Sequence, residues 1–241
     1  IHWDVELHEQ TGNILPDLRT GADIAGAEPL QANENLCSRG VQLYGSEFMV
    51  SPDRAKELGL GEVDGIEKYI RPYLNGKDLA QKERDVLVID LWGLDSGEVR
   101  SKYPAVYQHV KEHIKPERDQ SNEKKVRENW WLHGRPRPAL RDALEGLDRY
   151  IATVETSKHR FFQFLSTEVL PDNKIIGFGL DDGYYLGVLS SRTHVVWSLA
   201  AGGQLGPTPV YAKTQCFDPF PFPAASEAQK QRIRTLGEQL D

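Results

Sequence analysis

The sequence predicts an α+β fold in which a mixed or antiparallel sheet is flanked by helices. Short apolar runs of β type at 85–92 and 149–155 predict strands, and 96–114 carries apolar residues near helical spacing. A chain of 241 residues with 39% hydrophobic and 27% charged residues is long enough for a sizeable core and typical of a globular protein.

The N-terminal part of the chain predicts a connector followed by short elements. Residues 1–35 are rich in Gly, Pro, Asn and Asp and indicate a loop-rich connector. Residues 40–51 alternate enough to predict a pair of strands. Ser51 and Pro52 then favour the N-cap and first position of a short helix.

The next part of the chain predicts more strands. Residues 149–155 and 161–166 each predict a strand. The stretch 174–191 predicts a β-hairpin, with Asp182 and Gly183 in its turn.

The C-terminal part mixes helices with rigid loops. We expect a helix over 193–203 that stops at its two final glycines, and a loop over 204–211 because that stretch contains two prolines and a glycine. PFPFP at 219–223 is expected to be extended, and Ser226 to open a last helix.

The net charge of -7 argues at first against a nucleic-acid binder, because Lys and Arg neutralise phosphates in such proteins. The acid is concentrated at the front, since residues 1–70 hold 13 acidic and five basic side chains. Residues 111–137 hold eight basic and five acidic side chains. This modest excess of positive charge indicates either a surface that binds DNA or a solvated helical face.

Other bulk features favour a cytoplasmic protein with no membrane partner. No apolar run approaches the ~18–20 residues that span a bilayer, and the start lacks a signal-peptide pattern. Cys37 and Cys216 show no pairing pattern and are expected to be buried free thiols. Because the chain starts at Ile1 and stops inside a helical pattern, we expect an excised fragment of a longer protein.

Three patterns superficially match catalytic or cofactor motifs. DPFPF at 218–222 is close to the [D/N/S]PP[Y/F/W] loop of adenine methyltransferases, but a phenylalanine displaces the second proline, so no catalysis is expected. The glycines of 177–183 are interpreted as relief of crowding, because a cofactor loop needs a helix after it and a hairpin is expected instead. His109 and His113 lack a third metal ligand, so no metal site is predicted.

Several ordered segments carry a resemblance to a known family. They are IRPYLNGKDL at 70–79, VIDLWGL at 88–94, YPAVYQHVKEHIKPERDQ at 103–120, ENWWLHGRPRPALR at 128–141, YIATVETSKHRFFQFL at 150–165, LPDNKIIGFGLDDGYYLGVLSSRTHVVW at 170–197 and CFDPFPFP at 216–223. Together they resemble the target-recognition (specificity) domain of MmeI-like type IIG/IIL restriction-modification enzymes. In those enzymes adenine DNA methylation and restriction are fused in one polypeptide.

The resemblance implies a module for sequence-specific recognition of duplex DNA, without a catalytic site or cofactor of its own. The parent enzyme would be a bacterial adenine-N6 methyltransferase that uses S-adenosylmethionine, with magnesium for DNA cleavage. Its methyltransferase domain is then a partner within the same chain. The implied organisation is a connector at 1–35, the target-recognition domain at 36–224 and a truncated helical segment at 225–241.

Donors and acceptors on stiff supports predict where DNA is contacted. We expect the turn at 155–160 to grip phosphates, and the segments 172–174 and 204–213 to set the sequence preference, a region that the resemblance also supports. Solvated loops remain the alternative for each position. The predicted DNA-binding residues are Thr156, Ser157, Lys158, His159, Arg160, Asn173, Lys174, Gln204, Thr208, Tyr211, Lys213, Arg127 and Arg135.

Two other classes of function stay open. The acidic charge and the paired Trp130 and Trp131 also suit a protein-interaction or regulatory domain of a phage-defence complex, which salt-sensitive duplex binding would distinguish from a DNA reader. Core packing is expected for at least one of these tryptophans, since adjacent residues rarely share a face. The third alternative is that the chain is itself an enzyme, and methyl transfer by this chain alone would support it.

Overall fold

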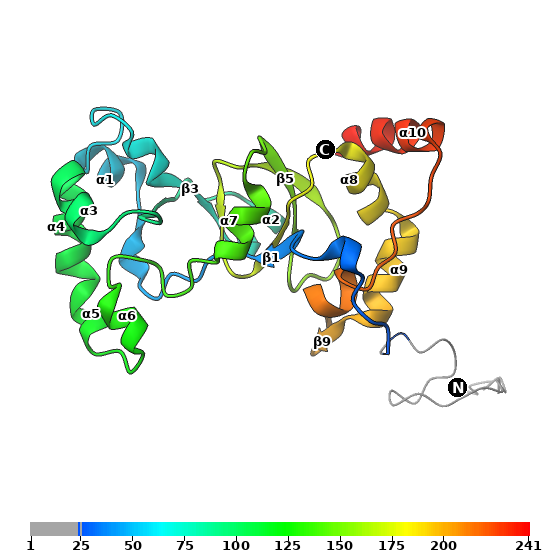
Figure 1. The fold of residues 1–241 in the computed structure, drawn as a ribbon, viewed down its shortest axis with the longest axis horizontal. Helices are drawn as coiled ribbons and strands as arrows, with labels where there is room; N and C mark the ends of the chain where they lie inside the picture. The colour runs from blue at the N-terminus through cyan, green and yellow to red at the C-terminus, as the bar shows by residue number, and fades with distance from the viewer. Residues whose placement is uncertain (1–23, 25) are drawn as a thin grey trace, which may run out of the picture.

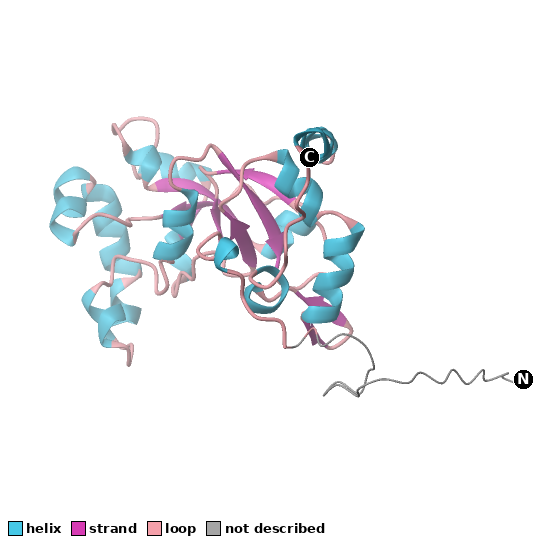
Figure 2. Ribbon diagram, turned by 45° about the vertical axis from the view of Figure 1, so that its right-hand side comes forward, coloured by secondary structure: helices cyan, strands magenta, loops and turns pink. Residues whose placement is uncertain are grey.

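The computed structural model describes Ile24 and residues 26–241, so most of the predicted connector lies outside the described residues. Two four-stranded sheets occupy the middle of an elongated molecule, and helices cluster towards both ends (Figure 1). Figure 2 shows the same strands surrounded by helices. The prediction of an α+β fold is therefore confirmed.

The elements follow one another in short steps along the chain. The strands are β1 Cys37–Arg39, β2 Met49–Val50, β3 Ile70–Leu74, β4 Leu87–Ile89, β5 Arg149–Val154, β6 Gln163–Ser166, β7 Leu170–Pro171, β8 Ile175–Phe178, β9 Gly203–Leu205 and β10 Thr208–Val210. The α-helices are α1 Pro52–Glu57, α2 Gly76–Ala80, α3 Ser96–Lys102, α4 Pro104–His113, α5 Lys115–Asp119, α6 Lys124–Glu128, α7 Pro138–Leu144, α8 Gly183–Leu189, α9 Arg192–Ala201 and α10 Glu227–Glu238. Short helical turns are η1 Gln31–Asn33, η2 Ser46–Phe48, η3 Ile66–Lys68 and η4 Lys213–Phe217.

The chain crosses between the two main sheets in short turns on both sides of β7. The first sheet has the order β1-β8-β5-β6 with antiparallel neighbours, and the second has the order β2-β4-β3-β7, in which only β3 and β7 run parallel. Because β7 belongs to the second sheet and β8 to the first, the turn at 172–174 carries the chain directly from one sheet to the other.

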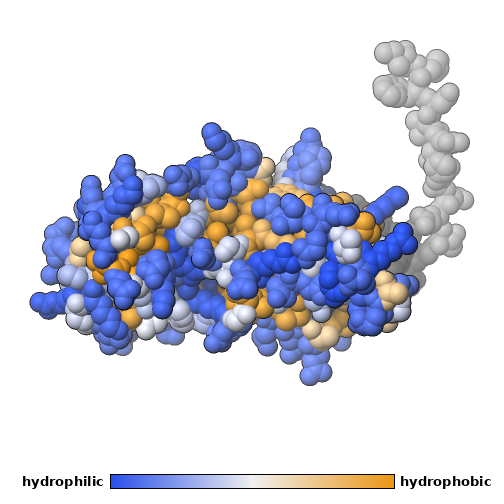
Figure 3. Space-filling view, turned by 90° about the horizontal axis from the view of Figure 1, so that it is seen from above, coloured by the Kyte–Doolittle hydropathy of each residue, from blue (hydrophilic) through white to orange (hydrophobic). Residues whose placement is uncertain are grey.

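Each half of the molecule has its own apolar core. Phe48, Ile89 and Val110 are among the buried residues of the half that holds α1 and α3–α6. Phe178 and Phe217 belong to the core beneath the first sheet, together with Cys216. Both cysteines are buried and free, as predicted, and burial raises the pKa of Cys216 to about 11. The face seen from above in Figure 3 is mostly hydrophilic, with hydrophobic residues visible near its centre.

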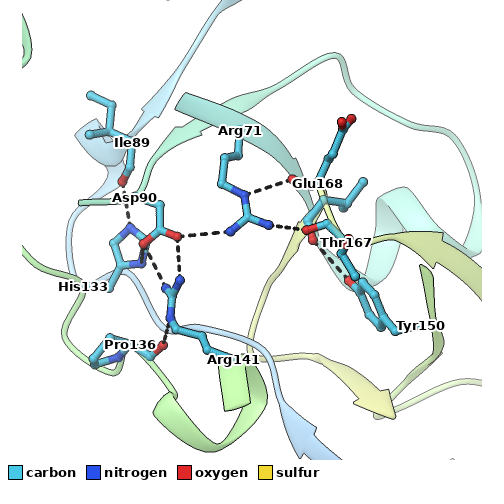
Figure 4. Close-up of polar contacts among 10 residues, drawn as sticks. Arg71, Ile89, Asp90, His133, Pro136, Arg141, Tyr150, Thr167 and Glu168 are labelled. Carbon is cyan, nitrogen blue, oxygen red and sulfur yellow. Dashed lines mark hydrogen bonds and ion pairs between the residues drawn. The ribbon is translucent and has the colours of Figure 1, made fainter. Parts of the chain in front are cut away.

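A buried ionic cluster fastens the second sheet to its neighbours (Figure 4). The carboxylate of Asp90, directly after β4, accepts two hydrogen bonds from Arg141 of α7, at 2.8 and 2.9 Å. It also accepts one from Arg71 of β3 at 3.5 Å, and Arg71 donates to the carbonyls of Thr167 and Glu168 ahead of β7. Burial alone would raise the pKa of Asp90, but the surrounding His133 and arginine side chains lower it below its usual value.

Several predicted elements form at the expected places because their end signals are local. Ser51 accepts a hydrogen bond from the backbone N–H of Arg54 at the start of α1, and Ser226 closes a capping box at the start of α10. Strands β4, β5 and β6 lie within the predicted runs, and α9 ends at Gly202. The helix predicted over 96–114 is divided in two, because Pro104 starts a new helix.

Three expectations were wrong. The hairpin predicted over 174–191 is a strand followed by helix α8, because Asp182 accepts from the N–H of Tyr184 as an N-cap instead of forming a turn. The loop predicted over 204–211 is the hairpin β9–β10, whose turn contains Gly206 at a φ of 58°. The stretch 40–51 holds one strand, β2, instead of a pair, and β1 just before it belongs to the other sheet.

Glycines let helices α8 and α10 pack closely. A Cβ at Gly237 would collide with the backbone of Gly183, and one at Gly187 would lie 2.8 Å from Ile233 Cγ2. The glycines of 177–183 also lie close to neighbouring atoms, which agrees with their interpretation as relief of crowding. A helix, α8, does follow them, although a hairpin was expected there.

We expect Gly237→Ala to lower the free energy of unfolding by about 1–3 kcal/mol, because the helices must separate. Urea denaturation would measure this, with Gly203→Ala as the control, since its Cβ has only Val210 Cβ near it, at 4.0 Å. Equal stability of the two variants would contradict close packing as the reason for Gly237.

Candidate nucleic-acid interface

An open cleft of about 1060 Å³ lies where the two sheets meet. Its lining comes from β3 and the segment after it, from the turn between β5 and β6, and from the turn between β7 and β8. The segment before β2 and the hairpin β9–β10 complete it. Six of the predicted DNA-binding residues line this single cleft: Thr156, Ser157, Lys158, His159, Lys174 and Thr208.

The turn after β5 presents its polar side chains from an anchored backbone. The Oγ of Ser157 donates to the carbonyl of His159 at 2.8 Å, and the N–H of Ser157 donates to Pro209 O at 3.3 Å. Lys158 and His159 are exposed at the tip of this turn. The ammonium of Lys158 has no hydrogen-bond or acidic partner among the described residues, so its charge is available to a ligand.

Arg160 and Tyr211 support this turn from inside. Arg160 donates to the carbonyl of Val154 and to the hydroxyl of Thr153, and its guanidinium lies 5.0 Å from the centre of the Tyr211 ring. Tyr211 is only 1% exposed, and its hydroxyl lies 3.2 Å from Nε2 of His194. Tyr211 is buried and the guanidinium of half-buried Arg160 bonds within the protein, so neither residue lines the cleft in this conformation.

The turn between the sheets contributes a second group of polar residues. Asp172 accepts hydrogen bonds from the Tyr73 hydroxyl and from the N–H of Lys174, both at 2.9 Å. The exposed ammonium of Lys174 donates to buried Glu155 at 2.8 Å. Asn173 lies between Asp172 and Lys174 and is half-buried.

The hairpin β9–β10 projects beside the first turn. Thr156 forms a β-bridge with Val210, which attaches the hairpin to the end of β5. Gln204 is exposed and Leu205 is 68% exposed, whereas Thr208 faces the cleft. The segment treated as a loop in the sequence is therefore a stiff support for these side chains.

Of the seven predicted residues that do not line the cleft, Lys213, Arg135 and Arg127 are each bonded within the protein. Lys213 donates to Asp218 at 2.7 and 2.9 Å. Arg135 pairs with Glu123 at 2.8 Å, and Arg127 on α6 donates to the carbonyl of Ser121 at 2.6 Å. Figure 1 shows α6 in the left half of the molecule and β9 in the right half.

Sequence reasoning missed the wall of the cleft that is formed by α2 and its flanking residues. Asn75, Lys77, Gln81 and Arg84 line this wall. The first two belong to the matched segment at 70–79, but no binding role was assigned to them. The only signal was the concentration of amides and cations directly after a strand.

The other motifs take structural roles. Phe220, in the tract similar to a methyltransferase loop, is 5% exposed and its ring packs 4.5 Å from that of His194. Trp130 is 9% exposed, and Trp131 donates from its indole to Leu94 O at 2.9 Å. Nε2 of His109 lies 2.9 Å from the carbonyl of Glu47. Among the described residues, no group of three or more His, Cys, Asp or Glu side chains is arranged to hold a metal ion.

A family model described as "MmeI, target recognition domain" matches residues 26–224. The chain belongs to this family. The MmeI target-recognition domain accounts for both sheets and for every segment of the cleft, since the matched residues contain them all.

Comparison with solved structures finds the same fold in MmeI. The domain is similar to the type IIL restriction-modification enzyme MmeI in complex with DNA, at 20% sequence identity and a TM-score of 0.74 over 94% of this chain. The match covers 30% of that MmeI chain. No curated protein matches the sequence. Within the described part of this MmeI-type domain, no helix is both long and apolar enough to cross a membrane.

Proposed function

We propose that this domain recognises a specific sequence in duplex DNA for a bacterial adenine-N6 methyltransferase with linked restriction activity. The observation that carries the proposal is the convergence of six polar residues, from three separate segments, on one cleft. Their supports are a strand-end turn, a turn between sheets and a hairpin, which are stiff enough to project donors into a groove. The solved MmeI structure of the same fold is a complex with DNA, which supports the same partner.

The proposal extends to the parent protein. Residues 1–35 connect the domain to a methyltransferase domain in the same polypeptide, 36–224 read DNA, and 225–241 begin a helical segment. The parent uses S-adenosylmethionine and, for cleavage, magnesium, while this domain binds neither. The parent acts in the cytoplasm. This organisation rests on the family and on the partial coverage of the MmeI chain.

We expect Lys158→Ala to weaken binding to every duplex alike and to reduce the slope of log K against log salt by about one. The reason is that its free ammonium suits a phosphate, which carries no sequence information. Fluorescence anisotropy at several salt concentrations would measure both effects, with exposed Lys68, which is outside the cleft lining, changed to Ala as the matched control. Equal effects of the two lysines would argue against the cleft as the interface, and absence of duplex binding by the unchanged domain at low salt would favour a protein-interaction domain.

We expect changes at Lys174 or Thr208 to alter which sequence is preferred. The turn at 172–174 and the hairpin β9–β10 place these side chains beside the phosphate-binding turn, where base edges would lie. Sequencing the fraction of a random duplex pool that binds each variant would measure the preference. A uniform loss of affinity, with the same enriched site, would remove these residues from sequence reading.

A further inference from the structure

The part of the cleft lining formed by α2 and the segment after it holds an arginine in a fixed orientation. Nε of Arg84 donates to Oδ1 of Asp78 at 2.6 Å, and Nη2 donates to Oδ2 at 2.9 Å. The Asp78 side chain is only 1% exposed, and its Oδ2 also accepts from the N–H of Asn75 at 2.8 Å. The acid is therefore anchored by the start of α2 and holds the guanidinium along one edge.

The other edge of this guanidinium is free. The bonds to Asp78 use Nε and one N–H of Nη2, so both protons of Nη1 and the second proton of Nη2 remain. Nη1 has no partner among the described residues, the Arg84 side chain is 47% exposed, and it lines the cleft. A planar fork of two donors is thus presented with its plane already set.

We propose that Arg84 reads a guanine in the recognition sequence, with its free fork donating to O6 and N7 of that base. This inference rests on the proposed function and adds a specificity residue on the wall to which no contact had been assigned. Two acceptors side by side in the plane of the base match a planar fork, and this pairing is the commonest specific contact in the major groove. Because Asp78 already orients the guanidinium, less side-chain entropy is lost on binding.

The neighbouring cation supplies the contrast that a test requires. Lys77 lines the same wall and is exposed, and its ammonium has no partner among the described residues. A freely rotating ammonium binds phosphate as a point charge and needs no fixed plane. Lys77 is therefore assigned to the backbone and Arg84 to a base.

Replacing Arg84 with glutamine should remove the preference for G at one position of the recognition sequence. We expect the affinity for the preferred duplex to fall about 5- to 150-fold, while the affinity for unrelated duplexes changes little. The measurement is sequencing of the bound fraction of a random duplex pool, followed by anisotropy titrations. Arg84→Lys, which keeps the charge without the planar fork, should retain the affinity for unrelated duplexes and lose part of the preference. Lys77→Gln should weaken binding to all duplexes and reduce the salt slope by about one.

Other outcomes separate this inference from the proposed function. A uniform loss of affinity with a lower salt slope in Arg84→Gln would make Arg84 a phosphate contact and overturn the guanine assignment. No change in Arg84→Gln, while Lys158→Ala loses affinity, would overturn the inference and leave the proposed function standing. Absence of duplex binding by the unchanged domain would overturn both. Urea denaturation of each variant shows whether it is folded, and Arg84→Lys keeps the test valid if the glutamine variant is not.

Discussion

Replacing Asp90 with alanine is expected to lower the free energy of unfolding by about 3–5 kcal/mol. The Asp90 side chain is 4% exposed, and it is the acid that faces both Arg71 and Arg141 in the buried cluster of Figure 4. Its removal leaves two poorly solvated guanidinium groups without a counter-charge, and that cost exceeds the value of an exposed ion pair. Chemical denaturation at pH 7 would measure the difference.

The matched control is an ion pair at the surface. Asp119 pairs with Lys115 at 2.6 Å but is 52% exposed, so Asp119→Ala should change the free energy of unfolding by less than about 1 kcal/mol. A small effect of Asp90→Ala, similar to that of the control, would show that Arg71 and Arg141 reach water when the acid is absent. Because the cluster links β3 and β4 to α7 and to the segment before β7, a large effect would also be expected to weaken DNA binding.

Acidification from pH 6.5 to about 4 is expected to cost about 3 kcal/mol of stability through His194 alone. Burial lowers the pKa of His194 to about 4, whereas an unfolded histidine titrates near 6.5. The unfolded chain therefore takes up the proton first. The stabilisation is complete above about pH 6.5 and is lost as the pH falls towards 4. Burial also lowers the pKa of His133 and of His109, which adds to the loss.

Free energies of unfolding measured between pH 7 and pH 4 would check this expectation. The carboxylates with lowered pKa, such as Asp78 and Asp90, keep their stabilisation down to about pH 5 and lose it mainly below their ordinary pKa near 4, so the loss between pH 6.5 and about 5 belongs to the histidines. His194→Asn should flatten the curve between pH 6.5 and 4, while exposed His159→Asn should not. A curve for His194→Asn as steep as that of the unchanged domain would rule out His194 as its source.

Local signals explain which parts of the fold were predictable. Ser51 and Ser226 cap helices by bonding to their own first turns, so neighbouring residues were enough. Asp182 with Gly183 suits both a turn and an N-cap, and the choice was made by the packing of α8 against α10. The loop over 204–211 was predicted partly because of Pro209. However, β10 is an edge strand that pairs in its own sheet only with β9, and an edge strand tolerates proline.

The sequence predicted only part of the candidate site, because the rest depends on contacts between residues that are not neighbours in the chain. The polar residues of 156–159 are consecutive, and two flanking strands marked them as a turn. The value of Arg84 depends on its pairing with Asp78, six residues away, and on the cleft that faces it. Nothing in the sequence around Tyr211 or Arg160 indicates that their side chains are directed into the protein. Only the packed structure shows it.

The attachment of the hairpin β9–β10 does not depend on its exposed side chains. The hairpin is joined to the end of β5 by the bridge of Thr156 with Val210 and by the bond from Ser157 N–H to Pro209 O, which involve main-chain atoms. Exposed side chains such as Gln204 and Leu205 can therefore be replaced without loss of the attachment. We therefore expect substitutions at these two positions to leave the fold unchanged, so the surface that the hairpin offers to a partner can be altered independently of the scaffold.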